Sequence, residues 1–401
     1  MLQDLTTPSS RVIEHELAQH FPAIMAMKTL SKLYRSALYQ EIKEELEDTL
    51  SSLEWGRAKE LAPARISEPL RVANWNIERG KELDAILHYL RHDSVLSRAD
   101  ILLLNEVDIG MGRTGNRNIA KELAEALGMY YVYAPSFMVL CKGVIGERCH
   151  DEPNRLGLYG DAVLSRYPIL SAANVPLIPT NNYFESSEPR LGHQRGLIAR
   201  VQLPDGPLDC ITTHLDLFAS THQRAQQLKA LLSHVEQLEG STRQLIGGDL
   251  NTITYNLKNK LTIATSIVFK LLRVGFNSAI EHYMTPELLY ERPVFEVLNE
   301  FGYEVDAFND RSKGTYYYDT NDELLRQRCE EKVPNFSLRW LEKRLKPWGG
   351  VVEIRLDWFA GRNITPITDE SEGLPPQVIE YPSWQGRLAS DHNPIVVDLK
   401  L

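Results

Sequence analysis

The stretch Gln244-Leu245-Ile246-Gly247-Gly248-Asp249-Leu250-Asn251 decides how the rest of the sequence is interpreted. Its apolar beginning predicts a β-strand over residues 244–247, and the polar side chains of Asp249 and Asn251 follow that strand. Taken alone, Gly248-Asp249 is also an ordinary turn sequence. The interpretation therefore depends on other segments of the same form in this chain.

Five more segments place polar side chains at the end of a predicted strand or apolar run. They are Asn74-Trp75-Asn76-Ile77-Glu78, Asn105-Glu106-Val107-Asp108, Thr213-His214-Leu215-Asp216, Arg355-Leu356-Asp357-Trp358 and Ser390-Asp391-His392-Asn393. Strand ends in a layered α/β protein meet along one edge, where ligands usually bind, so we expect these segments to converge. Each also has a structural explanation: Asn76 could form a turn, Glu106 could precede a helix, and His214 could be a core histidine.

The residue types in the six segments indicate a metal site. Burying several carboxylates together is unfavourable unless a cation holds them. The candidate ligands are Asn, Asp and Glu oxygens without a thiolate, a set that suits Mg²⁺, Mn²⁺ or Ca²⁺ better than zinc. The two histidines beside aspartates, His214 and His392, are suited to acid-base catalysis or to neutralising a phosphate.

The order of predicted elements favours an α/β layered fold with mixed sheets. From residue 70, short strands alternate with helices, and several loops are too short for a helical crossover between parallel strands. Strands are predicted near residues 71–76, 100–104, 130–134, 160–165, 196–203, 208–213, 352–359 and 394–399, and helices near 83–90, 119–127 and 221–238.

Two parts of the chain lie outside this alternation. Residues 1–65 are predicted to be a helical extension, because the run from Leu30 to Leu61 is rich in Leu, Lys and Glu and precedes Pro63. The extension either packs on the main domain or forms a helix pair for dimerisation or a partner. An insertion at about 255–350 combines a predicted helix with a segment rich in aromatic and charged residues.

Composition narrows the class of protein. The chain has 401 residues, with 44 Lys and Arg against 54 Asp and Glu, and a formal net charge of -10. This balance argues against a strongly basic binder of nucleic acid or membranes, although a metal can supply local positive charge. The four cysteines form no CxxC pair, and no apolar run approaches the ~20 residues of a membrane span. We expect a cytoplasmic protein with reduced thiols and no stable membrane insertion.

Taken in chain order, the six segments resemble the endonuclease/exonuclease/phosphatase superfamily, the deoxyribonuclease-I-like fold of metal-dependent phosphoesterases. Its members include abasic-site endonucleases, sphingomyelinases and inositol-polyphosphate phosphatases. The resemblance runs from about Arg71 to Leu401 and places the family's domain at residues 70–401; its most specific pieces are Gly247-Gly248-Asp249-Leu250-Asn251 and Ser390-Asp391-His392-Asn393-Pro394-Ile395. It implies a four-layered α/β/β/α sandwich with mixed sheets, and the strong motifs leave the 1–65 extension and the 255–350 insertion uncovered.

The resemblance also implies how the site residues divide the work. Asn76, Glu106 and Asp391 would hold Mg²⁺ or Mn²⁺. Asp249 would orient or deprotonate the attacking water, with help from Asn251. The reaction would be in-line hydrolysis of a phosphoester, in the first place a phosphodiester, without a covalent intermediate.

Two histidines would act on the phosphate. His392 would contact the scissile group while Asp357 accepts its other ring N–H and fixes the tautomer. His214 would lie on the opposite side as a phosphate contact or proton donor.

Three further residues have weaker assignments. Arg195 could contact phosphate, since a guanidinium matches phosphate geometry, or form a surface ion pair. Asp161 stands where the family often has Asn beside the substrate phosphate, and an aspartate there repels phosphate unless it is protonated or metal-bound. Glu78 would share a face with Asn76 in a continuing strand and could add to the metal site through water.

The substrate is left open among three alternatives. A nucleic acid could lie along basic side chains and stack on Tyr316–Tyr318 or on Trp348; the basic candidates are Arg113, Arg117, Lys142, Arg148 and Arg155. A small or lipid-derived phosphoester could be met by the helix at 263–276, with Lys258, Lys260, Lys270 and Arg273 near apolar residues; alternatively this helix is packed and its lysines are solvated. The third alternative is a catalytically inactive binding module. The oligomeric state is open.

Overall fold

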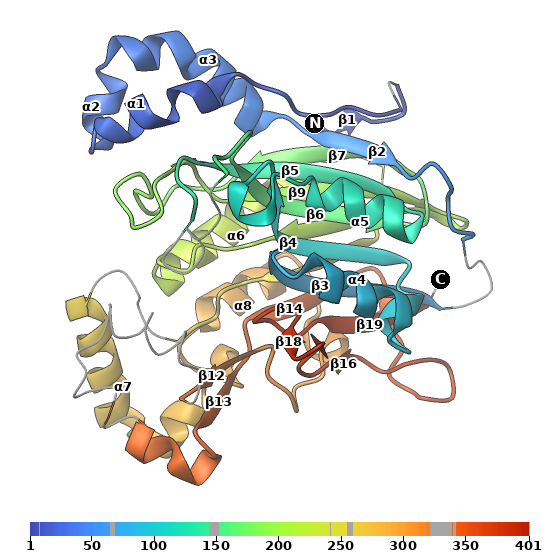
Figure 1. The fold of residues 1–401 in the computed structure, drawn as a ribbon. Coiled ribbons are helices and arrows are strands. Elements are labelled where there is room, and N and C mark those ends of the chain that lie inside the picture. The colour runs from blue at the N-terminus through green and yellow to red at the C-terminus, as the bar shows by residue number, and fades with distance from the viewer. Residues whose placement is uncertain are drawn as a thin grey trace.

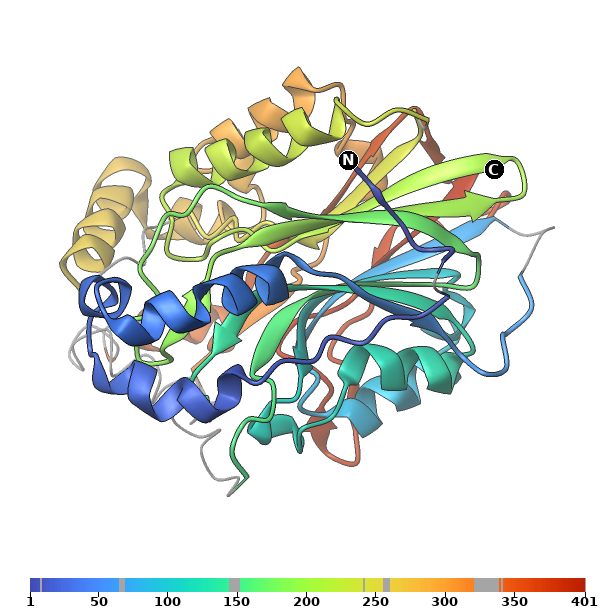
Figure 2. The same ribbon diagram turned by 90° about the horizontal axis from the view of Figure 1, so that it is seen from above.

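The computed structural model describes residues 1–7, 9–64, 69–143, 152–240, 242–254, 260–320, 339 and 342–400, and only the backbone of 260–268 and 348. Two β-sheets lie face to face in the middle of the molecule, with helices outside each sheet (Figure 1 and Figure 2). This is the predicted α/β/β/α sandwich with mixed sheets. Arg148, Lys258 and Trp340 fall outside the described residues.

The larger sheet has nine strands. They are β2 (Glu54–Arg57), β3 (Leu70–Arg79), β4 (Ile101–Ile109), β5 (Tyr130–Val139), β6 (Leu158–Ser165), β8 (Arg190–Gly192), β15 (Thr365–Pro366), β16 (Gln377–Val378) and β19 (Ile395–Lys400). The order is β15-β19-β3-β4-β6-β5-β2, with β16 beside β19 and β8 beside β5. Strands β3 and β4 are parallel, whereas β19 pairs with β3 antiparallel, so the sheet is mixed.

The smaller sheet has six strands in the order β1-β7-β9-β10-β11-β14. They are β1 (Gln3–Asp4), β7 (Ile169–Pro176), β9 (Arg195–Leu203), β10 (Gly206–Thr213), β11 (Gln244–Asp249) and β14 (Asp357–Arg362). Strands β10 and β11 are parallel and β14 is antiparallel to β11. Two short hairpins add β12 (Tyr316–Asp319) with β13 (Val351–Ile354), and β17 (Ser383–Trp384) with β18 (Arg387–Leu388).

Helices cover the outer face of each sheet. The α-helices are α1 (Phe21–Ala26), α2 (Leu30–Tyr34), α3 (Ala37–Ser51), α4 (Leu83–His92), α5 (Ile119–Leu127), α6 (Thr221–Val235), α7 (Lys260–Glu281) and α8 (Arg292–Glu300). Short 3-10 turns lie at Leu17–His20, Leu96–Arg98, Gly112–Thr114, Pro286–Leu288, Asp306–Phe308 and Lys346–Trp348. Gly128 ends α5 in the left-handed conformation, as its position after Leu127 predicts.

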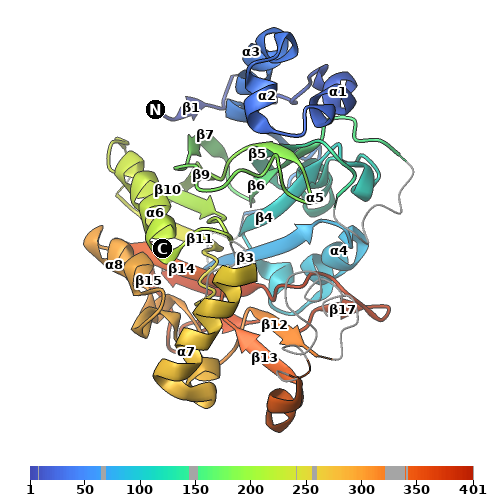
Figure 3. The same ribbon diagram turned by 90° about the vertical axis from the view of Figure 1, so that its left-hand side faces the viewer.

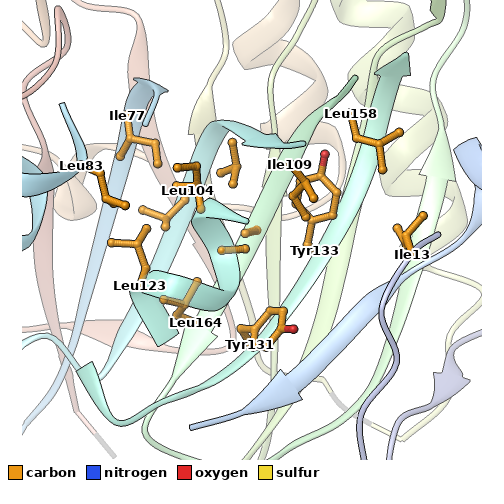
Figure 4. Packing of buried hydrophobic residues seen from close by; sticks show 14 of the residues in the cluster. Ile13, Ile77, Leu83, Leu104, Ile109, Leu123, Tyr131, Tyr133, Leu158 and Leu164 are labelled. Carbon is orange, nitrogen blue, oxygen red and sulfur yellow. The ribbon is translucent and has the colours of Figure 1, made fainter. Parts of the chain in front are cut away.

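Three buried clusters hold the layers together. Between the sheets, Leu103 and Val132 of the larger sheet pack with Leu245 of the smaller one. Outside the larger sheet, the faces of α4 and α5 pack on strand residues such as Leu104 and Leu164 (Figure 4). Outside the smaller sheet, α6 and α8 share a cluster with β9, β10 and β11. Strands buried on both faces explain the continuous apolar runs in the sequence.

The N-terminal segment joins both sheets. The helical run expected as far as Leu61 ends at Ser51, and the next residues form β2, which pairs with β5. The buried carboxylate of Glu54 explains the change, because it accepts from the Ile13 N–H (3.0 Å) and the Tyr131 hydroxyl (3.1 Å). At the other end of the segment, β1 pairs with β7.

A candidate metal-dependent catalytic site

The sheets bring the six polar segments to one edge. The carboxyl ends of β3, β4, β10 and β11 meet the amino ends of β14 and β19 there. Asp249 and Asp357 are direct partners across β11 and β14. Like charges directly opposite each other destabilise a strand pair, so this arrangement needs nearby positive charge.

Backbone irregularities aim the side chains at this edge. The pairing register shifts between Asn76 and Arg79 in β3, and between Leu104 and Val107 in β4. Glu106 adopts a φ of 55°, in the left-handed region. A regular strand would point Asn105 and Glu106 to opposite faces. The bulge lets both contact the site, and bulges of this kind are common beside active sites.

Asp249 lies at the centre of the cluster. One carboxylate oxygen, Oδ2, lies 3.2 Å from the Asn76 amide nitrogen, 3.4 Å from His214 Nε2 and 3.8 Å from His392 Nε2. The other oxygen, Oδ1, accepts from the Asn251 backbone N–H at 2.9 Å. Burial raises the pKa of Asp249, while His214 opposes the rise. Four sequence-predicted residues thus contact or approach one carboxylate.

Asn76 links Asp249 to Glu106. Its amide nitrogen lies 3.3 Å from Glu106 Oε1, and its amide oxygen accepts from the Glu78 N–H. Burial alone would raise the pKa of Glu106, but Arg79, His214 and His392 outweigh burial and lower it to about 2. Glu106 is therefore an anion at neutral pH, as a cation ligand must be.

His392 and Asp357 form the expected pair. His392 Nδ1 lies 2.7 Å from Asp357 Oδ2, and both side chains are buried. Burial favours the neutral ring, but Asp357 and Asp249 outweigh it and raise the pKa of His392 well above its ordinary value. The Ser390 hydroxyl accepts from the His392 N–H, which fixes the backbone of this segment.

His214 and Asn251 are held from the other side. The Tyr159 hydroxyl lies 3.5 Å from His214 Nδ1, at the limit of a hydrogen bond. The Asn251 side chain donates to the Leu215 carbonyl at 2.7 Å. Asn251 thus ties the loop after β11 to the residue that follows His214.

Asp161 is engaged inside the protein. Its Oδ1 accepts from the Asn105 amide at 2.9 Å, and the Asn105 oxygen accepts from the Asp249 N–H at 3.0 Å. Burial raises the pKa of Asp161 to about 6. Asp161 therefore positions Asn105, which in turn positions Asp249.

Of the remaining predicted residues, Asp391 and Glu78 lie near the cluster, whereas Arg195 does not. Asp391 lies close enough to contribute to the raised pKa of both Glu78 and His392. Burial, and secondarily Asp391, raises the pKa of Glu78 to about 7. The guanidinium of Arg195 bonds elsewhere: its Nε donates to Asn174 Oδ1 at 2.6 Å, and no described contact joins it to the cluster.

Besides Tyr159, sequence reasoning missed two contributors to the site. The guanidinium of Arg79 lies 3.8 Å from Glu106 Oε2, and the Tyr316 ring lies 5.1 Å from the His392 ring. Arg79 directly follows Glu78 in the first segment, so extending that segment by one residue would have included it. The aromatic run at Tyr316 was visible, but its approach to His392 depends on tertiary structure.

The described structure offers a possible metal group that differs from the predicted ligands Asn76, Glu106 and Asp391. Ligand atoms of Asp249, Asp357 and His392 lie within 4.8 Å of one another, a buried group that could hold a metal ion. The Asp357–His392 hydrogen bond already occupies one atom of each partner. Asp357 Oδ1 is buried without a hydrogen-bond partner, so the site has an unmet demand for positive charge.

The basic side chains proposed for a nucleic-acid groove are only partly available. Arg113 is buried and paired with Asp108 and Glu188, so its expected place in an open groove was wrong. Arg117 is paired with Glu122 on the surface. Among the described residues, no helix is both long and apolar enough to cross a bilayer.

Gly248→Ala is expected to lower the free energy of unfolding by about 3 kcal/mol. A Cβ at this position would lie 2.1 Å from the Thr213 carbonyl oxygen, which belongs to the neighbouring strand β10. Urea unfolding measures the loss. Gly115→Ala is the control, because its Cβ meets nothing within 4 Å and only the left-handed backbone costs about 1 kcal/mol. Equal losses in the two variants would contradict the steric explanation.

Solved structures with similar folds share little sequence with this chain. An endonuclease/exonuclease/phosphatase from Beutenbergia cavernae DSM 12333 is 19% identical, covering 83% of this chain and 72% of that chain, with a TM-score of 0.48. D. rerio TDP2 complexed with single strand DNA product is 15% identical, covering 83% and 99%, with a TM-score of 0.44. The human Nocturnin catalytic domain with bound sulfate anion is 14% identical, covering 87% and 96%, with a TM-score of 0.44.

A comparison with curated proteins finds no match. The model of the endonuclease/exonuclease/phosphatase family matches residues 73–392, which include all eleven predicted site residues and the strands β4, β10, β11 and β14 at the catalytic edge. The chain therefore belongs to the endonuclease/exonuclease/phosphatase family and is a phosphoesterase of that family.

Proposed function

We propose that the protein hydrolyses a phosphodiester bond by in-line attack of water, with Mg²⁺ or Mn²⁺ as its cofactor. The observation that carries the proposal is the position of Asp249, within 4 Å of Asn76, His214 and His392. A buried carboxylate that lies near an amide, two imidazole rings and the anionic Glu106 is suited to activating water beside a phosphate.

Glu106 and Asp391 would hold the cation, and Asn76 would join them by turning its amide oxygen toward the ion. In the present arrangement, Asn76 offers its amide nitrogen to Glu106 and Asp249. Because the amide can rotate by half a turn, the same position can supply either atom. A bound divalent ion supplies Lewis acidity to a phosphoryl oxygen and stabilises the leaving group.

Asp249 would accept a proton from the attacking water, with its Oδ1 held by the Asn251 N–H. His392 would donate from Nε2 to the phosphate while Asp357 holds Nδ1. The raised pKa of His392 favours the protonated ring, which suits contact with a phosphate anion. His214 would approach the phosphate or leaving group from the other side of Asp249.

A substrate panel with and without chelator tests the proposed reaction. The panel contains DNA, RNA, bis(p-nitrophenyl) phosphate, phospholipids and inositol phosphates, each assayed with Mg²⁺, with Mn²⁺ and with excess EDTA. We expect hydrolysis of at least one phosphodiester, complete loss in EDTA and recovery when Mn²⁺ is restored. Turnover that is insensitive to the chelator contradicts the proposal.

A further inference from the structure

Helix α7 projects at the edge of the molecule, close to the hairpin of β12 and β13 (Figure 1 and Figure 3). The helix is interrupted at Gly275, whose φ of 78° and ψ of 170° are not helical. The break separates an outer half, Lys260 to Val274, from an inner half that continues to Glu281. Because the helix changes course at Gly275, the side chains that face the rest of the protein can differ between the two halves.

The inner half and one outer residue fasten α7 beside the catalytic edge. Phe276 and Ile280 pack against the cluster of Ile253, Val352 and Ile354. In the outer half, the Lys270 ammonium donates to the Thr254 hydroxyl at 2.6 Å and lies 3.9 Å from the centre of the Tyr283 ring. Thr254 is three residues beyond Asn251, so the helix is tied to the loop that follows Asp249.

The outer half carries an apolar face that the described structure leaves open. Phe269 is 63% exposed and Leu272 is 82% exposed. Residues i, i+3 and i+4 of a helix share a face, so Phe269, Leu272 and Arg273 lie together. One exposed apolar residue is ordinary, but two large ones beside an exposed arginine form an amphipathic surface.

The charge of this segment is opposite to that of the whole protein. Residues 250–280 contain four basic residues, Lys258, Lys260, Lys270 and Arg273, and no Asp or Glu. The complete chain has a net charge of -10. Of these four, Lys270 is buried against Thr254 and Tyr283, and Arg273 is exposed beside Phe269 and Leu272. An exposed basic residue next to exposed apolar side chains, in a segment without acidic residues, complements an anionic lipid surface.

We propose that the outer half of α7 docks on anionic phospholipid bilayers, with Phe269 and Leu272 entering the interface and Arg273 meeting the lipid phosphates. Because α7 is fastened to the loop after Asp249, docking would hold the catalytic edge near the membrane surface. The further consequence, that the substrate is a phosphoester carried by the membrane, rests on the proposed function. Docking itself does not.

Vesicle co-sedimentation of the full chain tests the docking. We expect the protein to sediment with vesicles of phosphatidylcholine and phosphatidylglycerol, to remain in solution with phosphatidylcholine alone, and to be released by high salt. The double variant Phe269→Ser with Leu272→Ser should lose at least about tenfold in partitioning, because it removes two apolar side chains from the interface. Val12→Ser, at another exposed apolar residue (47%), is the matched control and should bind normally.

Two outcomes overturn the docking. The first is a wild-type protein that ignores phosphatidylglycerol vesicles, and the second is a double variant that binds them as well as wild type. If the wild type is a dimer that the double variant converts to a monomer, without vesicle binding in either, the face belongs to a protein interface. Should the double variant fail to fold, Arg273→Glu decides, because it should weaken binding to anionic vesicles by itself.

Hydrolysis of bis(p-nitrophenyl) phosphate separates the two proposals. The double variant should keep wild-type turnover of this soluble substrate, since neither residue contacts the catalytic cluster. Normal turnover without vesicle binding in the wild type overturns the docking alone. Normal vesicle binding without metal-dependent turnover of any panel substrate overturns the proposed function alone.

Discussion

Asp249→Asn is expected to reduce phosphodiester hydrolysis by about 10²–10⁴-fold, the range of a positioned general base. The substitution keeps the size of the side chain but removes the charge that faces His214 and His392. Because burial raises the pKa of Asp249, the protein bears a cost for the anion. In metal-free buffer, Tm should therefore stay the same or rise. A large loss of kcat with no loss of Tm distinguishes a catalytic residue from a structural one.

The control for this variant is Asp205→Asn. Asp205 is a partly exposed carboxylate that pairs with Arg243, at the ends of β10 and β11 opposite the catalytic edge. Its amide variant should keep both kcat and Tm close to wild type. Full activity in Asp249→Asn would support the alternative that the chain is a binding module on a retired catalytic scaffold.

Arg113→Met should lower the free energy of unfolding by about 3–5 kcal/mol, the cost of leaving a buried charge without its partner. Arg113 donates to both Asp108 oxygens, at 2.7 and 2.9 Å, and to Glu188 at 2.5 Å. Burial already raises the pKa of Asp108. Without the guanidinium, the Asp108 carboxylate either remains buried as an anion that has no cationic partner, or it takes up a proton. Urea unfolding at neutral pH measures the loss.

Arg117→Met provides the matched comparison for Arg113→Met. Arg117 pairs with Glu122, but both side chains are more than a third exposed, at 41% and 38%. An exposed pair contributes about 0–1 kcal/mol, so this variant should unfold near the wild-type urea concentration. Similar losses in the two variants would show that the Arg113 pair does not hold the chain between β4 and α5.

Local sequence signals predicted much of the fold and the site. The segments around Asp249 and His392 are short and follow apolar runs, and their functional side chains lie within a few residues of one another. Their convergence could be expected because strand ends share an edge. The 2.7 Å contact between His392 and Asp357 joins residues that are 35 positions apart, and it follows from that shared edge.

Features that depend on distant partners could not be predicted from the sequence. Strand β2 has four residues and follows a strongly helical sequence, and its pairing partner, β5, begins only at Tyr130. Arg113 resembles a groove arginine until its contact with Glu188, 75 residues away, is known. The bulge that turns Glu106 toward Asn76 likewise arises from strand pairing rather than from a local signal.

Anomalous diffraction from crystals soaked in Mn²⁺ shows whether the side chains gathered at the ends of six strands surround one divalent ion. We expect a single strong peak bonded to the Glu106 carboxylate, on the same side as Asp249, and loss of that peak in Glu106→Gln. If the enzyme hydrolyses phosphodiesters while its Mn²⁺ peak lies elsewhere, or while no peak forms at Glu106, then Glu106 does not hold the catalytic ion.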